Sequence, residues 1–443
     1  MDGGRDIRAN RNLMEYLNKN VTIFGLGKSG IASARKLASL GANVLASESK
    51  STIELSLAEA LKRIGVTIEL GGHTSKSIES TDLIIVSPGV HLDIPVLEKA
   101  KAKGIPIISE IELAYQFFTK PIIAVTGTNG KTTTTTLIGK MLKAGRKKVA
   151  VAGNIGFPLV EVDDSDLDYI VAEISSYQLE TIVNFKPWIG LILNIRPDHL
   201  ERHHSMQEYI EQKARIFMNQ TGDDYLVYNQ EDICVTEMIK KAKAKIIGFS
   251  KAHPEIITLP PEEIKIPGRH NLENALAAAQ AAYLCGVGKE TVAEVLRIFP
   301  GVEHRIEYVT NIDGVDFYND SKGTNPDSTL VAIETFTGRG MVLIMGGRDK
   351  GVSLDDLSKK VKETVKAVIL IGEAAFKFEQ SLREAGFDSI HLAGSMDEAV
   401  RKSFLLASEN EIVLLSPACA SFDMFANYEE RGKAFKQACL NLK

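Results

Sequence analysis

The chain has 443 residues, of which 44% are hydrophobic and 25% charged, and its formal net charge is −5. This length predicts roughly two to four domains of about 100–200 residues each, with the composition of a globular protein. The lack of a basic surplus argues against nucleic acid or an anionic membrane as a partner.

The cysteines and the N-terminal residues point to a reducing compartment. The four cysteines are scattered, with no C-x-x-C spacing, which argues against a disulfide framework or a zinc site. Residues 1–20 lack the apolar core of a signal peptide, and no run approaches the ~18 apolar residues of a membrane span. We therefore expect a cytoplasmic protein.

The first glycine-rich turn follows a short apolar strand at 21–24, after a loose start over residues 1–18. It reads Gly25-Leu26-Gly27-Lys28-Ser29-Gly30 and leads into an amphipathic helix, and the next strand, at 43–48, ends in Glu48. This G-x-G-x-x-G pattern predicts a diphosphate at a helix N-terminus and a sugar hydroxyl beside the acid. A dinucleotide and a UDP-sugar both satisfy it, and a purely structural turn is the alternative.

Further strands at 83–86 and 105–108 complete the first α/β domain, which ends near Thr119. The first of these strands is followed by the tight loop Ser87-Pro88-Gly89-Val90. Ligands collect at the carboxyl edge of such doubly wound sheets, so this loop is a candidate binding segment.

A second phosphate-binding turn opens the central domain. An apolar strand at 121–125 runs into Thr126-Gly127-Thr128-Asn129-Gly130-Lys131-Thr132 and then into a helix. Backbone N–H groups at the glycines, the Lys131 charge and the Thr132 hydroxyl are the groups that hold a nucleotide phosphate and Mg²⁺. Val125 replaces the first glycine of the general pattern, so this is a shortened P-loop.

An apolar strand at 168–173 delivers Glu173 at its end, close in sequence to Gly153-Asn154-Ile155-Gly156 and to Ser175. A carboxylate at the tip of a strand beside a P-loop suits Mg²⁺. The alternative is a capping or surface acid.

The histidines at 199–204 follow another strand, which ends in Arg196-Pro197-Asp198-His199. The glutamate between His199 and His203 is one place off the H-E-x-x-H pattern, which argues against zinc protease chemistry. His203 and His204 are interpreted as solvent-facing. Lys213 lies in a predicted helix over 206–217, where by itself it would be a solvated lysine.

The last third repeats the alternation of strand and helix. An alanine-rich helix over 268–284 precedes the end of the second domain near residues 299–301, and buried-type strands follow at 341–345, 367–371 and 411–415. We therefore predict an α/β protein of three domains, Rossmann-like over 1–119, a P-loop ATPase type over 120–300 and Rossmann-like again over 301–443.

Taken together, the motifs resemble those of the Mur ligase family over essentially the whole chain. The segments that carry the resemblance are Thr126–Thr132, Gly153–Gly156, Glu173, Asp198-His199, His270-Asn271-x-x-Asn274, Glu303-His304-Arg305 and Asn319-Asp320-Ser321-Lys322. The ending Ser416–Asp423 with Glu430-Arg431-Gly432 resembles the branch that adds D-glutamate.

The resemblance implies an ATP- and Mg²⁺-dependent ligase of peptidoglycan precursor synthesis. It would join D-glutamate to UDP-N-acetylmuramoyl-L-alanine through an acyl phosphate, as a monomer that closes on its substrates. The implied catalytic residues are Lys131, Glu173, His199, Lys213 and Lys322. Lys213 matches the lysine that is carbamylated in this family, which reverses its interpretation as a solvated residue.

The resemblance also assigns ligands to the remaining positions. ATP would meet Gly127, Thr128, Asn129, Gly130, Lys131, Thr132, Thr133, Asn271, Asn274, Arg305 and Asp320, with His304 nearby. The metals would meet Thr132, Glu173, His199 and carbamylated Lys213. The UDP-substrate would meet Gly27, Lys28, Ser29, Glu48, Ser87, Gly89, Asn154, Ser175 and Gln178, and D-glutamate would meet His199, Thr324, Lys350, Ser421, Phe422 and Tyr428.

Three alternatives remain at this point. A sister ligase could add another amino acid, although the Asp-Asn-Pro-Arg string of the diamino-acid branch does not occur here. A nicotinamide-dependent oxidoreductase would explain the first glycine turn but not the P-loop. A non-catalytic nucleotide-binding regulator would not need Lys350 and Ser421.

Overall fold

The computed structural model describes residues 15–349 and 351–442. These form two compact units, one of residues up to Thr258 with Glu273–Val295, the other of Leu259–Leu272 with the residues from Leu296 onward. The first unit holds two sheets and the second unit holds one. Among the described residues, no helix combines the length and apolar character needed to cross a bilayer.

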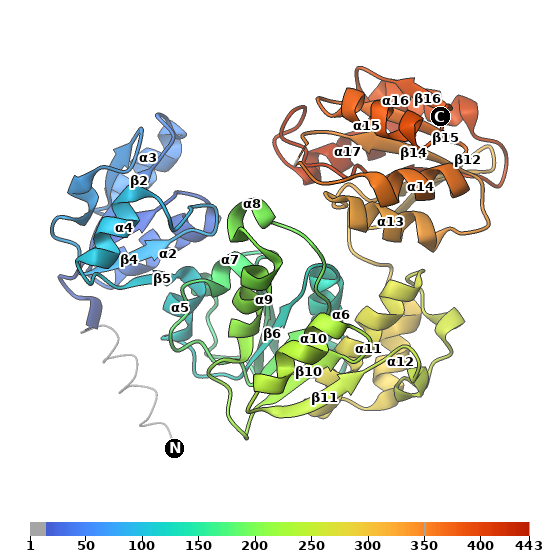
Figure 1. Ribbon diagram of the computed structural model, residues 1–443. Coiled ribbons are helices and arrows are strands. Elements are labelled where there is room, and N and C mark those ends of the chain that lie inside the picture. Colours follow the sequence, from blue (N-terminus) through green and yellow to red (C-terminus); the bar gives the residue numbers. More distant parts are fainter. Residues whose placement is uncertain (1–14, 350, 443) are drawn as a thin grey trace. The chain divides into compact units, whose positions relative to one another are not determined.

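The first sheet has five parallel strands in the order β3-β2-β1-β4-β5. Strands β2, β4 and β5 of this sheet are labelled in the blue part of Figure 1. Its strands are β1 (Asn20–Phe24), β2 (Asn43–Glu48), β3 (Thr67–Leu70), β4 (Leu83–Val86) and β5 (Ile107–Ser109). Its helices are α2 (Lys28–Ser39), α3 (Leu55–Arg63), α4 (Pro95–Ala102) and α5 (Glu110–Tyr115). Tyr16, inside the start expected to be loose, is buried and donates a hydrogen bond of 2.5 Å to Gln116.

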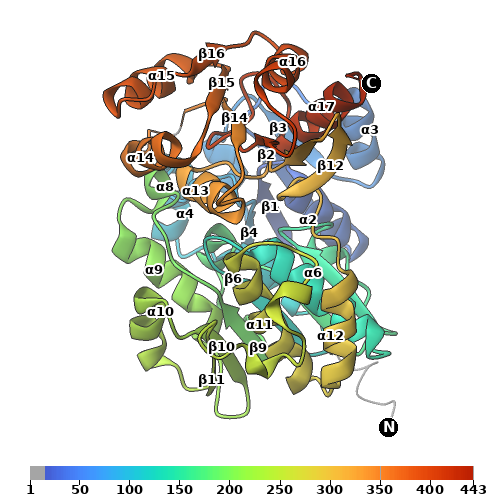
Figure 2. The ribbon, with the colours of Figure 1, turned by 90° about the vertical axis from the view of Figure 1, so that its right-hand side faces the viewer.

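The second sheet has six parallel strands in the order β11-β10-β9-β6-β8-β7. Figure 2 shows β9, β10 and β11 side by side. Its strands are β6 (Ile122–Thr126), β7 (Val149–Gly153), β8 (Tyr169–Glu173), β9 (Ile189–Ile192), β10 (Tyr225–Asn229) and β11 (Lys245–Phe249). The following helices are α6 (Lys131–Ala144), α7 (Ser176–Leu179), α8 (Leu200–His203), α9 (Met206–Ala214), α10 (Ile233–Met238), α11 (Arg269–Leu284) and α12 (Lys289–Ile298).

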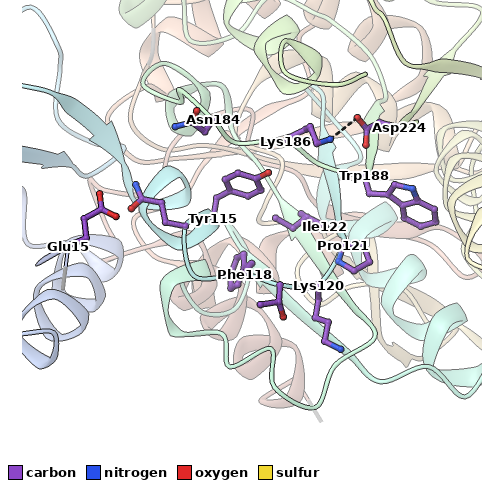
Figure 3. A pocket seen from close by; sticks show the side chains of 12 residues that line it. Glu15, Tyr115, Phe118, Lys120, Pro121, Ile122, Asn184, Lys186, Trp188 and Asp224 are labelled. Carbon is purple, nitrogen blue, oxygen red and sulfur yellow. Dashed lines mark ion pairs between the residues drawn. The ribbon is translucent and has the colours of Figure 1, made fainter. Parts of the chain in front are cut away.

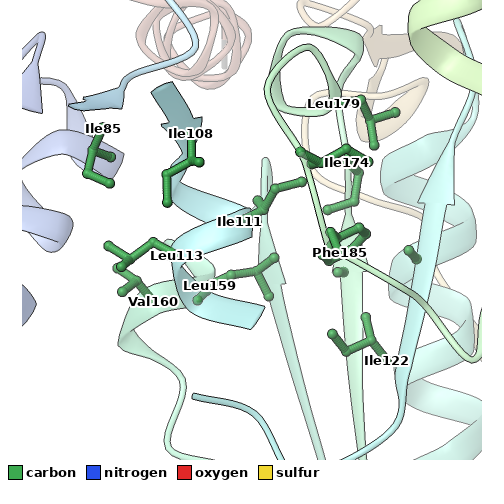
Figure 4. Close-up of a cluster of buried hydrophobic side chains, with 14 of the residues drawn as sticks. Ile85, Ile108, Ile111, Leu113, Ile122, Leu159, Val160, Ile174, Leu179 and Phe185 are labelled. Carbon is green, nitrogen blue, oxygen red and sulfur yellow. The ribbon is translucent and has the colours of Figure 1, made fainter. Parts of the chain in front are cut away.

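Helix α5 joins the two sheets of the first unit. Its side chains Ile111 and Leu113 belong to one buried cluster with Ile85 and Ile108 of the first sheet and with Phe185 of the central domain (Figure 4). The carboxylate of Glu112 accepts backbone N–H groups from Val183, Asn184 and Phe185 at 2.8–2.9 Å. Apolar burial and these charge-assisted bonds fix the helix to both sides.

The sheet of the second unit has the order β12-β13-β17-β14-β15-β16. It is parallel except for a hairpin between β12 and β13, which the sequence analysis did not anticipate. Its strands are β12 (Glu307–Ile312), β13 (Val315–Asn319), β14 (Met341–Gly346), β15 (Ala367–Ile371), β16 (Ile390–Leu392) and β17 (Ile412–Leu415). Its helices are α13 (Pro326–Thr335), α14 (Asp355–Thr364), α15 (Ala375–Glu384), α16 (Met396–Leu406) and α17 (Tyr428–Leu440).

Candidate active site

The first glycine turn is held by two polar side chains from neighbouring strands. Gly25 has φ +87°, and a Cβ on Gly30 would lie 1.9 Å from the Gly25 carbonyl oxygen, so helix and turn approach more closely than any side chain allows. Ser87 donates to that carbonyl oxygen at 2.7 Å, and Glu48 accepts the Leu26 N–H at 2.7 Å. The turn is therefore rigid, with Gly27 and Lys28 at its exposed side.

The Glu48 carboxylate is committed to the backbone. Burial opposes its charge, but the N–H groups of Leu26 and Lys50 more than offset this and lower its pKa. It remains a predicted ribose partner, in addition to its observed role in fixing the turn. The other residues predicted to meet the UDP-substrate in this domain lie at the start of α2 and after β4, namely Lys28, Ser29 and Gly89.

The P-loop takes the backbone course that its glycines allow. Gly127 has φ +149° and Gly130, at the N-cap of α6, has φ +84°. The four threonines 132–135 that begin the helix are buried, and Thr134 donates to Asn274 Oδ1 at 3.3 Å. Packing, rather than helix propensity, thus explains the β-branched start of this helix.

The P-loop is anchored by the segment after β9. Asn194 accepts the Asn129 N–H at 2.8 Å and donates to the Asn129 carbonyl at 3.1 Å. The Thr128 hydroxyl accepts the Arg196 N–H at 2.9 Å and lies 3.1 Å from the Tyr209 hydroxyl. Sequence reasoning missed Asn194 and Tyr209, although the place of Asn194 directly after a buried strand is the signal that could have identified it.

Two lysines meet at one carbonyl of the P-loop. Lys131 and Lys213 donate to the Gly127 carbonyl oxygen at 2.8 and 2.9 Å, and Lys131 also donates to the Thr128 carbonyl at 2.8 Å. Lys213 is 1% exposed, and its ammonium lies 4.7 Å from the centre of the Tyr209 ring. Burial, and then the charge of Lys131, lower the pKa of Lys213 well below its ordinary value.

Glu173 ends β8 beside the strand that leads into the P-loop, in register with Val125. Its side chain is 1% exposed; Oε1 accepts a hydrogen bond from Asn154 Nδ2 at 2.8 Å, whereas Oε2 is buried with no hydrogen-bond partner among the described residues. A buried carboxylate oxygen without a donor is costly, and a divalent cation is the ligand that would satisfy it. The residues therefore fit Mg²⁺.

Two more residues predicted to meet the UDP-substrate stand directly after Glu173. Ser175 and Gln178 form a capping box at the start of α7, in which Gln178 Oε1 accepts the Ser175 N–H at 2.9 Å. Gln178 is buried. Their side chains thus shape the backbone after Glu173.

His199 stands at a strained turn after β9, with φ +57°, and its ring centre lies 4.9 Å from that of Tyr177. His203 is 1% exposed and hydrogen-bonds Ser176 at 3.0 Å, so its interpretation as solvent-facing is wrong. Burial, with the neighbouring positive charges, lowers the pKa of His203 to about 4. Aromatic packing against Tyr177 and Tyr209 is the tertiary cause.

In the second unit, Asp320 follows β13 and is buried. Its carboxylate accepts the Ser416 hydroxyl at 2.7 Å and the Ile306 N–H at 3.3 Å, and burial raises its pKa to about 6. The Nε of Arg305 is also buried, with no hydrogen-bond partner among the described residues. Asn271, at the start of α11, donates to the Pro267 carbonyl at 2.7 Å.

The residues predicted for the acyl phosphate and D-glutamate gather after β13 and β17. The ammonium of Lys322 lies 5.3 Å from the centre of the Tyr428 ring. Ser421 is buried, Thr324 is half-buried and Phe422 is 65% exposed. Lys350 lies outside the described residues. Loops after neighbouring parallel strands thus bring Lys322 and Ser421 to one edge of the sheet.

One pocket of the first unit lies at the amino ends of β6 and β9, whereas the P-loop lies at the carboxyl end of β6. It has a volume of about 780 Å³, and its lining includes Ile122 at the start of β6 and Trp188 just before β9 (Figure 3). The Lys186 ammonium within it pairs with Asp224 at 3.3 Å. The P-loop follows the carboxyl end of β6, so this pocket lies away from it.

Three family models match successive parts of the chain. They are the Mur ligase MurD-like N-terminal domain over residues 19–109, the Mur ligase middle domain over 125–282 and the Mur ligase glutamate ligase domain over 304–419. The chain belongs to the Mur ligase family. The predicted family and the predicted three-domain α/β fold are thereby confirmed. The first glycine turn lies within the match to the MurD-like N-terminal domain, so it does not indicate a nicotinamide-dependent oxidoreductase.

Curated relatives agree with this membership, and solved structures agree with the fold. The UDP-N-acetylmuramoylalanine–D-glutamate ligases of Caldanaerobacter subterraneus and Clostridioides difficile are 45% and 42% identical, over 97% of this chain and 100% of each relative. UDP-N-acetylmuramate-alanine ligase MurC of Thermotoga maritima has a TM-score of 0.60 at 22% identity, over 96% of this chain and 100% of that one. Folylpolyglutamate synthase of Mycobacterium tuberculosis, complexed with ADP, has a TM-score of 0.56 at 13% identity, over 72% of this chain and 90% of that one.

Proposed function

We propose that this Mur ligase joins D-glutamate to UDP-N-acetylmuramoyl-L-alanine in peptidoglycan precursor synthesis. The γ-phosphoryl group of ATP is transferred to the substrate carboxylate, which leaves ADP, and the amine of D-glutamate then displaces phosphate from the acyl phosphate. The observation that carries the proposal is the match over nearly the whole chain to curated relatives named for this activity. The P-loop with its two lysines supports the ATP part, because a loop of this kind is built for a nucleotide phosphate.

The residues of the first unit act on ATP and the metal. Gly127–Thr133 and Asn274 form the nucleotide cradle, and Lys131 supplies the fixed charge near the transferred phosphoryl group. A bound Mg²⁺ would supply positive charge to offset the negative charge of the phosphates. Thr132, Glu173 and His199 are the residues that would hold it, and the unpartnered Oε2 of Glu173 supports this assignment.

Lys213 is proposed to be carbamylated. A carbamate forms only on a neutral amine, and burial together with Lys131 pushes Lys213 toward that form. The modified group would be an anion beside the P-loop, which suits a second metal ligand.

The residues of the second unit serve the phosphoryl group and the amino acid. Arg305, Asp320 and Asn271 are assigned to ATP, and Lys322 to the acyl phosphate, whose charge a fixed ammonium stabilises. Thr324, Lys350, Ser421, Phe422 and Tyr428 are assigned to D-glutamate. Hydroxyl and ammonium groups are the donors that a dicarboxylate requires.

The first domain is assigned to the UDP-substrate, through Gly27, Lys28, Ser29, Glu48, Ser87 and Gly89, with Asn154, Ser175 and Gln178 of the central domain. The proposed domain boundaries are 1–119, 120–300 and 301–443. The protein is proposed to act in the cytoplasm as a monomer.

An amino-acid panel tests the assignment. Phosphate release is measured with ATP, Mg²⁺ and UDP-N-acetylmuramoyl-L-alanine, adding in turn D-glutamate, L-glutamate, L-alanine and a diamino acid. We expect phosphate release with D-glutamate and with none of the other amino acids. Equal turnover with L-alanine or a diamino acid would reassign the chain to a sister ligase, and no turnover with any of them would leave it a nucleotide-binding regulator.

A further inference from the structure

Arg431 of α17 is the largest side chain that the structure buries completely. It is 1% exposed, and among the described residues no carboxylate lies within ion-pair distance of its guanidinium. Burial lowers the pKa of Arg431 to about 10, so the side chain still carries its charge at neutral pH. A buried charge of this kind is costly unless its donors are fully used.

The guanidinium donors reach two loops. Nε donates to the Ser321 hydroxyl at 3.0 Å and Nη2 to the Ser321 carbonyl at 2.8 Å. Nη2 also donates to the Cys419 carbonyl at 3.1 Å, and Nη1 to the Ala420 carbonyl at 3.2 Å. The first loop follows β13 and the second follows β17, which are neighbouring strands.

Both loops carry residues of the proposed site one position further on. Lys322 follows Ser321, and Ser421 follows Ala420. The Ser321 hydroxyl in turn donates to the Tyr428 carbonyl at 2.8 Å, which ties the first turn of α17 to the same network. Lys322, Ser421 and Tyr428 are therefore fixed relative to one another through a single guanidinium.

We infer that Arg431 is a positioning residue for the amino-acid end of the reaction, through the hydrogen bonds by which its guanidinium sets the spacing of the Lys322 and Ser421 loops. The inference rests on the proposed assignment of Lys322 and Ser421 to the site. A lysine cannot replace it, because one ammonium on a flexible stem does not present Nε and two Nη donors in a fixed plane.

The same sheet offers a matched control. Arg339 donates to the Asn410 carbonyl at 3.0 Å, to the Glu411 carbonyl at 3.4 Å and to the Asp316 carboxylate at 2.9 Å. These groups also belong to β13 and to the segment before β17, but at the ends of the strands that lie away from the Lys322 and Ser421 loops.

The test compares Arg431→Lys, Ser321→Ala and Arg339→Lys in the full-length enzyme, each assayed well below its own melting temperature. We expect Arg431→Lys to lower kcat/KM for D-glutamate about 100-fold, since a misplacement near 1 Å has an effect of that order. KM for the UDP-substrate should stay within about twofold, because its proposed site lies in the other unit. Ser321→Ala should lower kcat/KM for D-glutamate about 10-fold, and Arg339→Lys should lower it less than about threefold.

Each outcome decides between positioning and general stability. If Arg431→Lys keeps kcat/KM for D-glutamate within about threefold of wild type, or if Arg339→Lys loses as much as Arg431→Lys, the inference is overturned. If Arg431→Lys does not fold, Ser321→Ala decides, and unchanged kinetics overturn the inference. Lys322→Ala and Ser421→Ala are measured alongside, because wild-type activity in both would reject the proposed site itself, whatever Arg431 does.

Discussion

The first unit contains two glycine turns, one after β1 and one after β6. In both, a glutamate ends a strand that pairs with the strand before the turn, but the two glutamates differ in their hydrogen bonds. Glu48 ends the strand beside β1, and Glu173 ends the strand beside β6. Both oxygens of Glu48 accept backbone N–H groups, at 2.7 and 3.1 Å, whereas Oε2 of Glu173 has no hydrogen-bond partner within the described part of the chain. The first carboxylate completes a turn, and the second is left available to a cation.

The two turns also differ in the charge of the side chains that contact them. The first is held by a carboxylate and a hydroxyl, whereas the second has two lysines on one carbonyl. A similar glycine pattern therefore supports a turn fixed by hydrogen bonds to its backbone in one domain and a concentration of positive charge in the other. The chemistry of a phosphate site is decided by what surrounds the turn.

Removal of the P-loop charge should have the largest effect. We expect Lys131→Ala to lower kcat/KM about 1,000-fold, about 4 kcal/mol, because in-line transfer concentrates negative charge that a fixed cation must stabilise. The measurement is phosphate release with all substrates present. Lys28→Ala in the first turn is the comparison and should raise only KM for the UDP-substrate, about 10-fold. Equal losses in the two variants would contradict the contrast between the turns.

Glu173→Gln should lower kcat about 100-fold and raise the Mg²⁺ concentration needed for half-maximal rate, because the amide cannot supply an anionic oxygen ligand. Activity is measured across an Mg²⁺ titration. Glu48→Gln serves as the control, and its Mg²⁺ dependence should match that of the wild type. A Glu173→Gln enzyme with unaltered Mg²⁺ dependence would contradict the proposed role of Glu173 in metal binding.

A third buried glutamate extends the comparison to pH. Glu110 Oε1 accepts the Val160 N–H at 2.6 Å, Oε2 has no hydrogen-bond partner among the described residues, and burial raises the pKa of this carboxyl to about 7. Because its pKa is raised on folding, the folded state holds the proton over a wider pH range, and stability falls as pH rises through the interval from about 4.5 to 7.

The expected contribution of Glu110 is a loss of about 2 to 3 kcal/mol between pH 5 and pH 8. Glu110→Gln should remove this slope, as measured by urea unfolding at the two pH values. Glu48→Gln should change the pH dependence in the opposite sense, because the lowered pKa of Glu48 gives stability that is lost as pH falls. Parallel pH profiles for wild type and Glu110→Gln would show that the carboxyl does not titrate in this range.

Gly30→Ala should destabilise the first domain by about 2 kcal/mol, because its Cβ would lie 1.9 Å from the Gly25 carbonyl oxygen. Gly27→Ala is the matched control, since nothing lies within 4 Å of its Cβ position, and it should change the free energy of unfolding by about 0.5 kcal/mol. Thermal unfolding measures both. Similar melting temperatures for the two variants would argue against close packing of turn and helix.

The smallest effect is expected for Glu48→Gln on substrate binding. Loss of one charge-assisted bond to the Leu26 N–H should raise KM for the UDP-substrate about 10-fold and leave KM for ATP unchanged. Asn194→Ala, which removes hydrogen bonds to the second turn, should raise KM for ATP and leave KM for the UDP-substrate unchanged. Initial rates at varied concentrations of each substrate measure both, and an effect of Glu48→Gln on ATP would show that the turns are not independent.

The sequence by itself determined the three α/β domains, both glycine turns and the family, because each depends on local patterns of apolar strands, glycines and charged residues. Strand 43–48 was predicted at the bounds of β2. The hairpin at β12 and β13 was missed, although Asp313-Gly314, with φ values of +47° and +82°, is a local signal for such a turn.

Only the tertiary structure decided which charged groups are satisfied. Nothing in the local sequence distinguishes Glu48, which accepts two N–H groups, from Glu173, or a solvated lysine from Lys213 against Gly127 and Tyr209. His203 and Arg431 are buried by residues distant in sequence. The physical reason is that burial, and with it the pKa and the role of an ionisable group, is set by packing between elements that the local pattern does not encode.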